Sequence, residues 1–295
     1  MWTDRIAGLT TRRLREPETI GALAADRARP ESLLGPSGKA LVIAADHPAR
    51  GSLRAGDDPL AMADRGELLR RLCVALARPG VTGVLGTADI LEDLLLLDAL
   101  HGRAVFGSMN RGGLAGADFE IDDRFTGYDA AAIARFGYDG GKMLLRVDLA
   151  DSRTAPTLLA CSNAVDELAD RELVAMVEPF VARRADGTLR NDLSVEAATT
   201  ALTVAAGLGH TSAYTWLKVP VIGDGGEDMG RVLAATTLPT LLLGGEVARD
   251  ADATYGRWRR ALRHPNACGL VVGRSLLYPP DGDVAAAVDT AASLL

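Results

Sequence analysis

Short apolar runs alternate with longer amphipathic stretches along most of this chain. The runs are rich in Leu and Val, as is typical of strands that are covered on both faces of a parallel sheet. The runs that we predict to be strands are 39–46, 81–87, 103–109, 142–148, 173–179, 214–220, 240–246 and 269–275. Between them the apolar residues follow the spacing of helices, for example over 67–79 and 195–209.

This order predicts about eight strand–helix units within about 250 residues, which is the size and rhythm of a (β/α)8 barrel. A doubly wound open sheet is the alternative, but it usually has fewer strands and a Gly-rich first turn, whereas the first strand here runs into AADHPARG. We therefore predict an α/β fold, a (β/α)8 TIM barrel, in which residues 1–295 form a single domain and residues 1–38 an N-terminal helical extension. Residues 120–131 are expected to belong to an enlarged loop after the third strand.

The charge and the apolar runs of the sequence argue against nucleic acid and membrane partners. The net charge is −7 and no basic run is interleaved with aromatic residues, which argues against nucleic acid. Apolar stretches such as 94–97 are far too short to cross a membrane. The first residues carry charges throughout and lack the apolar core of a signal peptide, so we expect a cytoplasmic protein.

The cysteines and histidines do not suggest a metal site. Cys73, Cys161 and Cys268 form no CxxC pair, and the four histidines show no HExxH or HxH spacing. The cysteines fit buried thiols in a reducing compartment. We therefore expect neither a zinc site nor a cofactor.

Charged residues interrupt several predicted strands, where a charge is costly unless it has a partner or a function. In a barrel, catalytic residues lie at the C-terminal ends of the strands. Asp46, Glu178 and Lys218 stand near such ends. Lys142 is the exception, because the predicted boundaries put it at the start of the fourth strand, on the same face as the substrate-binding candidate Arg146.

Lys218 is one of three lysines, with Lys39 and Lys142, among 32 Lys and Arg residues. Unlike Arg, a lysine can lose its proton and attack a carbonyl carbon. Its ordinary pKa of about 10.4 must fall for this. An apolar setting beside Trp216, which we also expect to contact the substrate, and the charge of Lys142 would both lower the pKa. These features predict that Lys218 forms an imine.

An imine withdraws electrons from a nearby carbon–carbon bond, and breaking that bond also needs a group that takes the hydroxyl proton. Glu178 and Asp46 are the candidates for this acid/base role. Alternatively, Lys218 and one of these carboxylates form an ion pair that merely stabilises the barrel. Buried ion pairs rarely gain net stability over apolar packing, so the catalytic interpretation is favoured.

Glycines and an arginine follow the last two predicted strands. Gly244 and Gly245 end the seventh strand, and Gly273 and Arg274 end the eighth. Barrel enzymes often bind phosphate with these two loops and a short helix. The residues after Gly273 supply such a helix start, with N–H groups for an anion and the guanidinium of Arg274. A Gly-Gly pair alone fits a tight turn, but the two pairs together favour a phosphate site.

At these positions the sequence resembles class I, Schiff-base aldolases, namely tagatose-1,6-bisphosphate, archaeal-type fructose-1,6-bisphosphate and deoxyribose-phosphate aldolases. The motifs that carry the resemblance are ADHP, KMLLRVD, VEPF, WLKVP, LLLGGE and GLVVGRSLLY, between about residues 39 and 290. The resemblance implies these roles: imine formation by Lys218, proton transfer by Glu178 and Asp46, assistance by Lys142, and phosphate binding by Gly245 and Arg274.

The sequence departs from the pattern of these aldolases in several places. DHP stands where many relatives have DHG, and the fifth strand carries Glu178, as in the tagatose type, instead of the tyrosine of the archaeal type. The N-terminal extension and the loop NRGG…DDRFTG match neither type. The chain is also similar to an actinobacterial aldolase-like family linked to inositol catabolism, which implies a phosphorylated deoxy-keto-gluconate as substrate.

Other polar residues near the strand ends have two open interpretations. His47 hydrogen-bonds either a substrate hydroxyl or the turn that follows it. Asn110, Arg111 and Gly112, together with Arg124, form either the distal wall of the substrate site or a solvated loop.

The leading hypothesis is a metal-independent class I aldolase that cleaves or forms a phosphorylated keto sugar or keto sugar acid. An isomerase or dehydratase could use the same lysine, and a non-catalytic sugar-phosphate-binding protein could keep the pocket. Two retained lysines in so lysine-poor a chain argue against the last hypothesis. We expect a small phosphorylated sugar as ligand, no nucleic acid or membrane partner, and a homo-oligomer.

Overall fold

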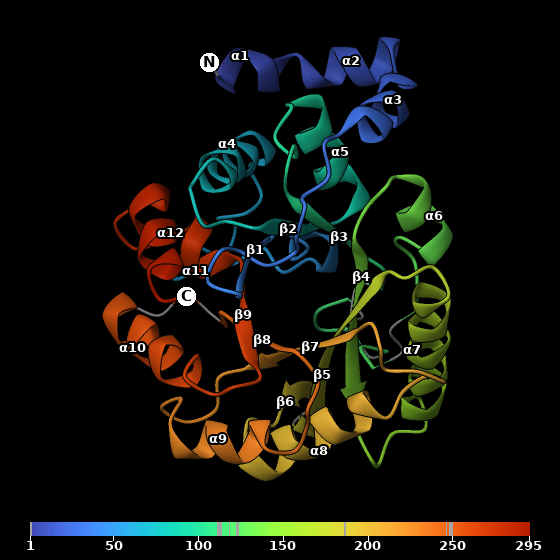
Figure 1. Cartoon of the computed structure of the whole chain (residues 1–295), viewed down its shortest axis with the longest axis vertical. Coiled ribbons are helices and arrows are strands. Elements are labelled where there is room, and N and C mark those ends of the chain that lie inside the picture. The colour runs from blue at the N-terminus through green and yellow to red at the C-terminus, as the bar shows by residue number, and fades with distance from the viewer. Residues whose placement is uncertain are drawn as a thin grey trace.

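Every predicted strand overlaps a strand of the computed structural model, which describes residues 2–110, 114–117, 119–121, 124–185, 187–245, 247 and 250–295. The strands that form the barrel are β1 (Ala40–Ala44), β2 (Gly83–Gly86), β3 (Ala104–Ser108), β4 (Gly140–Val147), β5 (Val174–Ala185), β7 (Thr215–Pro220), β8 (Thr240–Leu243) and β9 (Ala267–Val272). Each pairs in parallel with its neighbours, and the β1–β9 and β4–β5 pairings close the ring. The fold is a (β/α)8 TIM barrel, as predicted (Figure 1).

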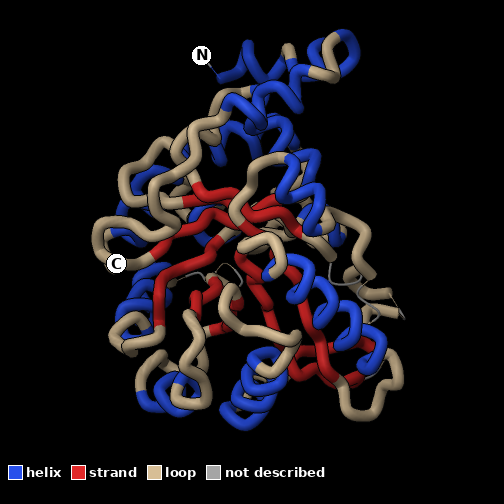
Figure 2. Tube along the Cα trace, turned by 45° about the vertical axis from the view of Figure 1, so that its right-hand side comes forward, coloured by secondary structure: helices blue, strands red, loops and turns tan. Residues whose placement is uncertain are grey.

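Helices surround the ring of strands, as Figure 2 shows with helices in blue and strands in red. They are α4 (Arg65–Leu76), α5 (Ala88–Leu96), α6 (Ala130–Arg135), α7 (Thr154–Ala169), α8 (Val195–Ala206), α9 (Glu227–Leu233), α10 (Ala251–Ala261), α11 (Arg274–Leu277) and α12 (Val284–Ala292). A short 3-10 turn, η1 (Pro48–Arg50), follows β1. None of the described helices is long and apolar enough to cross a membrane.

The N-terminal segment folds into three helices on the outside of the barrel: α1 (Trp2–Ala7), α2 (Leu9–Arg15) and α3 (Thr19–Asp26). They lie beside α4 and α5 (Figure 1). Arg13 anchors them, because its guanidinium pairs with Glu92 at 2.8 Å and with Asp93 at 2.9 Å.

The interior of the barrel is filled at the end away from the strand C-termini. Alternate strand residues such as Val42 and Met176 point inward and are buried. Leu33 and Leu34, from the segment before β1, pack against this inner cluster. Side chains therefore close this end of the barrel, and the cavity described next opens toward the other end.

The fifth strand is longer than predicted. It continues past residue 179 to Ala185, where it turns back and pairs in antiparallel fashion with β6 (Thr188–Asn191). This hairpin supplies part of the wall of the cavity described next.

Candidate active site

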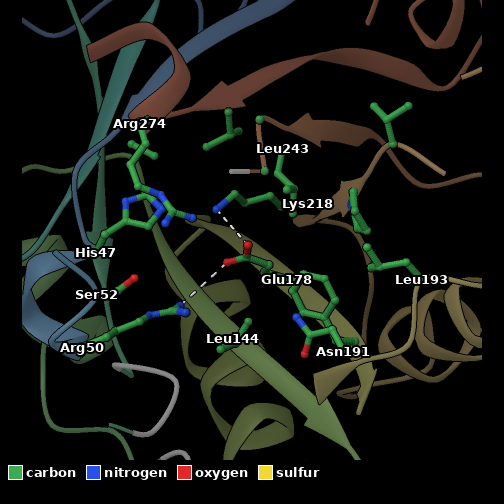
Figure 3. Close-up of a pocket in the computed structure, with 18 of the residues that line it drawn as sticks. His47, Arg50, Ser52, Leu144, Glu178, Asn191, Leu193, Lys218, Leu243 and Arg274 are labelled. Carbon is green, nitrogen blue, oxygen red and sulfur yellow. Dashed lines mark ion pairs between the residues drawn. The ribbon is translucent and has the colours of Figure 1, made fainter. Parts of the chain in front are cut away.

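A cavity of about 710 Å³ opens at the C-terminal ends of the strands. Lys218 and Glu178 lie at its floor, and His47, Arg50 and Arg274 line its sides (Figure 3). Catalytic residues of TIM barrels are expected at this end.

Two lysines and two carboxylates form one buried cluster. Lys142 Nζ lies 2.6 Å from Glu178 Oε2 and 2.9 Å from Asp46 Oδ2. Lys218 Nζ lies 3.1 Å from Glu178 Oε1. Lys218 and Glu178 line the cavity, whereas Lys142 is 0% exposed and lies beneath them with Asp46. All four predicted catalytic residues thus come together.

The stagger of the barrel brings Lys142 into this cluster. In sequence it stands near the start of its strand, and the prediction placed it away from the active end. The pairing register sets Lys142 opposite Ser108, the last residue of β3, and Met176 of β5. Because strands in a closed barrel are sheared relative to one another, an early position in β4 is level with the end of β3. Lys142 therefore lies at the active end of the barrel, and the prediction that it lies away from that end is wrong.

The electrostatic environment favours a neutral Lys218. Burial lowers the pKa of this lysine, and the charge of Lys142 lowers it further, while Glu178 and Asp46 oppose the shift without cancelling it. Burial alone would raise the pKa of each carboxylate, but nearby cations, Lys142 first, outweigh it, so both carboxyl pKa values are lowered. The cluster thus combines an ionised carboxylate with a lysine that gives up its proton readily.

Trp216 occupies a different place from the one predicted. It shares the inward face of β7 with Lys218 but lies deeper in the barrel, in tilted contact with Phe106 at 6.1 Å between ring centroids. It is not among the residues that line the cavity. Its ring belongs to the apolar packing beneath the lysine.

The predicted phosphate-binding residues Gly244, Gly245, Gly273 and Arg274 all line the cavity. The backbone passes so close to its neighbours here that side chains would not fit. A Cβ on Gly273 would lie 2.3 Å from the Ala44 carbonyl oxygen, and one on Gly244 would lie 2.5 Å from a methyl carbon of Val272. Gly245 has a φ of 68°, which suits glycine.

Arg274 is the first residue of the short helix α11, so its backbone N–H belongs to a helix start. Its guanidinium donates to the Arg54 carbonyl oxygen at 3.3 Å. The arrangement offers an anion both backbone donors and a cation.

His47 lines the cavity beside this loop, with its side chain 20% exposed. Burial, assisted by the charges of Arg274 and Lys218, lowers its pKa to about 3 despite Asp46. Its Nδ1 is buried, lies 4.0 Å from Asp46 Oδ1 and has no hydrogen-bond partner among the described residues. A neutral imidazole with a free ring nitrogen suits a substrate hydroxyl better than a substrate anion.

The predicted substrate-binding residue Arg146 and the residues proposed for the distal end of the site separate into different groups. Arg146 lines the cavity and pairs with Glu120 at 3.2 Å. Arg124 is exposed and is not among the lining residues. Arg111 and Gly112 lie outside the described residues.

Asn110 fits neither of the two interpretations offered for it, substrate wall or solvated loop. It is 0% exposed, and its amide donates to the Leu144 carbonyl oxygen at 2.7 Å and accepts from the Leu144 N–H at 2.8 Å. Asn110 therefore extends the pairing of β3 with β4 beyond the end of β3. Its backbone carbonyl also accepts from Ser108, whose hydroxyl lies 3.3 Å from Asp46 Oδ2.

Sequence reasoning missed several lining residues. Arg50 stands four residues after Asp46, and that spacing at a strand end was a usable signal. Phe180 and Asn191 line the cavity from the β5–β6 hairpin. The Asp-Gly pair at 186–187 is a hairpin signal that could have indicated this turn. Within the part of the chain that the structure describes, no group of three or more His, Cys, Asp or Glu residues could hold a metal ion.

Comparison with known proteins identifies the family. The family model of Cgl0159-like proteins matches residues 38–292. The crystal structure of Cgl0159 from Corynebacterium glutamicum is 50% identical, covers 99% of this chain and 96% of its own, and superposes with a TM-score of 0.94. No curated protein matches this sequence.

More distant structures share the fold. An archaeal fructose 1,6-bisphosphate aldolase is 17% identical over 89% of this chain and 95% of its own, with a TM-score of 0.67. A Schiff-base-forming fructose-1,6-bisphosphate aldolase is 17% identical over 89% of this chain and 96% of its own, with a TM-score of 0.64. Because the family model covers most of the sequence and Cgl0159 is similar along nearly the whole chain, this protein belongs to the Cgl0159-like family.

Proposed function

We propose that this protein is a class I aldolase, which cleaves or forms a carbon–carbon bond in a phosphorylated keto sugar or keto sugar acid through an imine on Lys218. The observation that carries the proposal is the contact of Lys218 with Glu178, at 3.1 Å on the floor of the cavity. A nucleophile and an acid/base within hydrogen-bond reach are what this chemistry needs. The shared fold of Schiff-base-forming fructose-1,6-bisphosphate aldolase is consistent with it.

The reaction begins when the neutral Lys218 amine attacks the keto carbon of the substrate. A carbinolamine forms, and its hydroxyl takes up a proton from solvent and leaves as water, which gives a protonated imine. Glu178 then takes the proton of the hydroxyl on the carbon β to the imine carbon. The O–H electrons become the new C=O bond, the carbon–carbon bond breaks, and its electrons form an enamine as the iminium nitrogen is neutralised. Protonation of the enamine and hydrolysis release the ketone and free the lysine.

The carboxylates have different roles in this proposal. Glu178 lines the cavity and is placed to exchange protons with the substrate, whereas Asp46 does not line it. Asp46 holds Lys142 at 2.9 Å, and Lys142 in turn fixes Glu178 at 2.6 Å. In this proposal Asp46 is a positioning residue, and proton transfer with the substrate is assigned to Glu178. Lys142 contributes its charge, which lowers the pKa of Lys218.

The phosphate of the substrate is assigned to the loops after β8 and β9. Gly244, Gly245, Gly273 and Arg274 surround one side of the cavity, and His47 lies next to them. An arginine and closely approaching backbone amides recognise phosphate through charge and through directed hydrogen bonds. The predicted homo-oligomer, the cytoplasmic location and the link to inositol catabolism remain predictions.

Imine trapping tests the proposal. Borohydride reduction in the presence of dihydroxyacetone phosphate, or of a panel of phosphorylated ketoses and keto acids, should add the mass of one reduced adduct to the peptide that contains Lys218. Lys218→Arg should abolish the label. Lys39→Arg is the matched control, because Lys39 binds the Leu262 and Ala267 carbonyls far along the chain and does not line the cavity.

A label at Lys142, or no label under conditions of full turnover, would overturn the assignment. A coupled assay for triose release should detect carbon–carbon cleavage. Turnover without release of a carbonyl fragment would indicate an isomerase or dehydratase with the same lysine, and labelling without turnover would indicate a binding protein.

A further inference from the structure

Arg50 points into the cavity, and its guanidinium makes no hydrogen bond to the described residues. Its side chain is 15% exposed, and Nε is buried without a partner among the described residues. Its ion-pair partners are Glu178 Oε2 at 3.9 Å and Asp46 Oδ2 at 4.0 Å, both too far for hydrogen bonds. A guanidinium carries five N–H donors, and leaving the buried Nε–H without a partner is costly.

The backbone of Arg50 is held firmly, so the free guanidinium is not a consequence of a loose turn. The Arg50 N–H donates to the His47 carbonyl oxygen at 3.0 Å, and its own carbonyl accepts from Ala115 N–H at 3.1 Å. Gly51, which follows with a φ of 73°, closes the turn through its N–H to the Pro48 carbonyl oxygen at 2.9 Å. The position of Arg50 at the cavity is therefore preorganised.

A structural role as partner of the two carboxylates explains Arg50 poorly. Glu178 and Asp46 are already held by lysines at 2.6 to 3.1 Å. A third cation at 3.9 to 4.0 Å adds little to those pairs and leaves its buried Nε–H without a partner among the described residues. The geometry instead leaves room for a substrate atom.

The space between Arg50 and Glu178 fits one oxygen atom. The two side chains face each other across 3.9 Å, and an oxygen about 2.8 Å from each closes that triangle. Glu178 meets Lys218 with its other oxygen, so Arg50 and Lys218 reach the same carboxylate from two sides (Figure 3). An oxygen in this space would be bonded to a carbon near the one attached to Lys218.

We propose that Arg50 is a catalytic residue of the carbon–carbon bond step, whose guanidinium donates a hydrogen bond to the substrate oxygen that gives its proton to Glu178. The inference rests on the proposed aldolase function. As Glu178 removes the proton, that oxygen gains negative charge before the carbon–carbon bond breaks and the C=O bond forms. Arg50 keeps its own protons and stabilises the charge. In the reverse reaction it polarises the aldehyde that accepts the enamine.

The proposed role of Arg50 predicts different effects on the two half-reactions, which are activation of the ketone and formation or cleavage of the carbon–carbon bond. Imine and enamine formation from a ketone do not involve the aldehyde oxygen, so they do not need Arg50. Only the step that makes or breaks the carbon–carbon bond does. Loss of one donor to a developing oxyanion typically lowers kcat by about 10²- to 10³-fold.

The experiment compares Arg50→Gln and Arg50→Lys with wild type, using dihydroxyacetone phosphate as the ketone probe and glyceraldehyde as the aldehyde probe. Exchange of the ketone α-proton in D₂O and borohydride labelling of Lys218 report the ketone half-reaction. Formation of the condensation product reports the carbon–carbon step. Arg50→Gln should slow condensation by about 10²- to 10³-fold and leave exchange within about threefold of wild type. Arg50→Lys should recover part of the loss.

Arg54→Gln is the matched control. Arg54 lies in the same loop, is exposed and does not line the cavity, so condensation should be unchanged. Thermal unfolding checks that each variant is folded. If Arg50→Gln does not fold, the exchange and condensation rates of Arg50→Lys are compared with wild type instead. Equal losses in exchange and condensation, or condensation at the wild-type rate in Arg50→Gln, would overturn this inference alone. A wild type that neither labels nor exchanges with the ketone would overturn the aldolase proposal and this inference with it.

Discussion

Lys142 and Lys218 contact the two oxygens of a single carboxylate, Glu178, at 2.6 Å and 3.1 Å. Only Lys218 lines the cavity, and Lys142 is fully buried beneath it. The shorter contact belongs to the buried lysine, so Glu178 is held in place without depending on the lysine that must react. The pair thus separates an electrostatic lysine from a nucleophilic one.

Replacing Lys142 with Met should shift the acid limb of the rate–pH profile to higher pH. The positive charge of Lys142 lowers the pKa of Lys218, so its removal raises that pKa and reduces the neutral amine at a given pH. Labelling of Lys218 should be slow at neutral pH and recover as the pH rises. An unshifted profile in folded protein would assign Lys142 a purely structural role. Because loss of one partner of a buried pair costs about 3–5 kcal/mol, rates should be compared at equal folded fractions.

Glu178→Gln should preserve labelling of Lys218 and lose most carbon–carbon cleavage. The amide keeps the shape of the side chain but cannot accept the hydroxyl proton, and general base catalysis contributes about 10²- to 10⁴-fold. Single-turnover labelling and triose release measure the two steps separately. Asp46→Asn is the comparison, and it should cost less because Asp46 does not contact the cavity. If Glu178→Gln stays within about threefold of wild type while Asp46→Asn does not, Asp46 is the base.

The fold was predictable because each barrel strand is an apolar run bounded by polar turns, a property that is local in sequence. The strand-end rule then predicted that Asp46, Glu178 and Lys218 share one end of the barrel. They do come together, although only Asp46 lies past the end of its strand, whereas Lys218 lies within β7 and Glu178 within the long β5. What the rule missed depends on contacts between strands. The position of Lys142 follows from its register with Ser108. The stagger between two strands cannot be predicted from the sequence of either strand alone.

Residues outside the strands were harder to predict. Arg50 lies in a 3-10 turn whose path is set by backbone hydrogen bonds to His47 and Ala115. Asn110 looked like a loop residue, and its role became visible only from its two bonds to Leu144 across the sheet. Trp216 was predicted to contact the substrate because it shares a strand face with Lys218. That face gives the direction of its side chain but not its depth in the barrel.

Lys218→Met should be more stable than wild type near neutral pH. Burial outweighs the attraction of Glu178, so the pKa of Lys218 in the folded state lies below its unfolded value of about 10.4. The unfolded state therefore binds the proton of this lysine more readily than the folded state does. The resulting loss of folding stability is complete below the folded pKa of Lys218 and vanishes as the pH rises above about 10.4. The Tm advantage of the variant should shrink accordingly with rising pH. A variant less stable than wild type at neutral pH would mean that the ion pair with Glu178 contributes net stability.

Turnover should persist in excess EDTA. In the proposed mechanism the protonated imine accepts the electrons of the breaking bond, which is the role a Lewis-acidic metal ion plays in other aldolases. The coupled assay, run before and after exhaustive chelation, measures this directly. Complete loss of turnover that zinc restores would replace the imine with a metal-dependent mechanism.

Arg274→Ala should weaken the reaction selectively for phosphorylated substrates. A charge-assisted hydrogen bond to phosphate is worth about 1.5–3 kcal/mol, and each 1.36 kcal/mol is tenfold, so kcat/KM should fall by about 10- to 150-fold. The unphosphorylated analogue never makes this contact and serves as the control, with a much smaller loss expected. Inorganic phosphate should compete with substrate in wild type and compete poorly in the variant, because Arg274 lines the same side of the cavity as Gly244 and Gly245. Equal losses on both substrates would mean that Arg274 supports the loop through its bond to the Arg54 carbonyl. The phosphate assignment would then fall, whereas the chemistry of Lys218 would not depend on it.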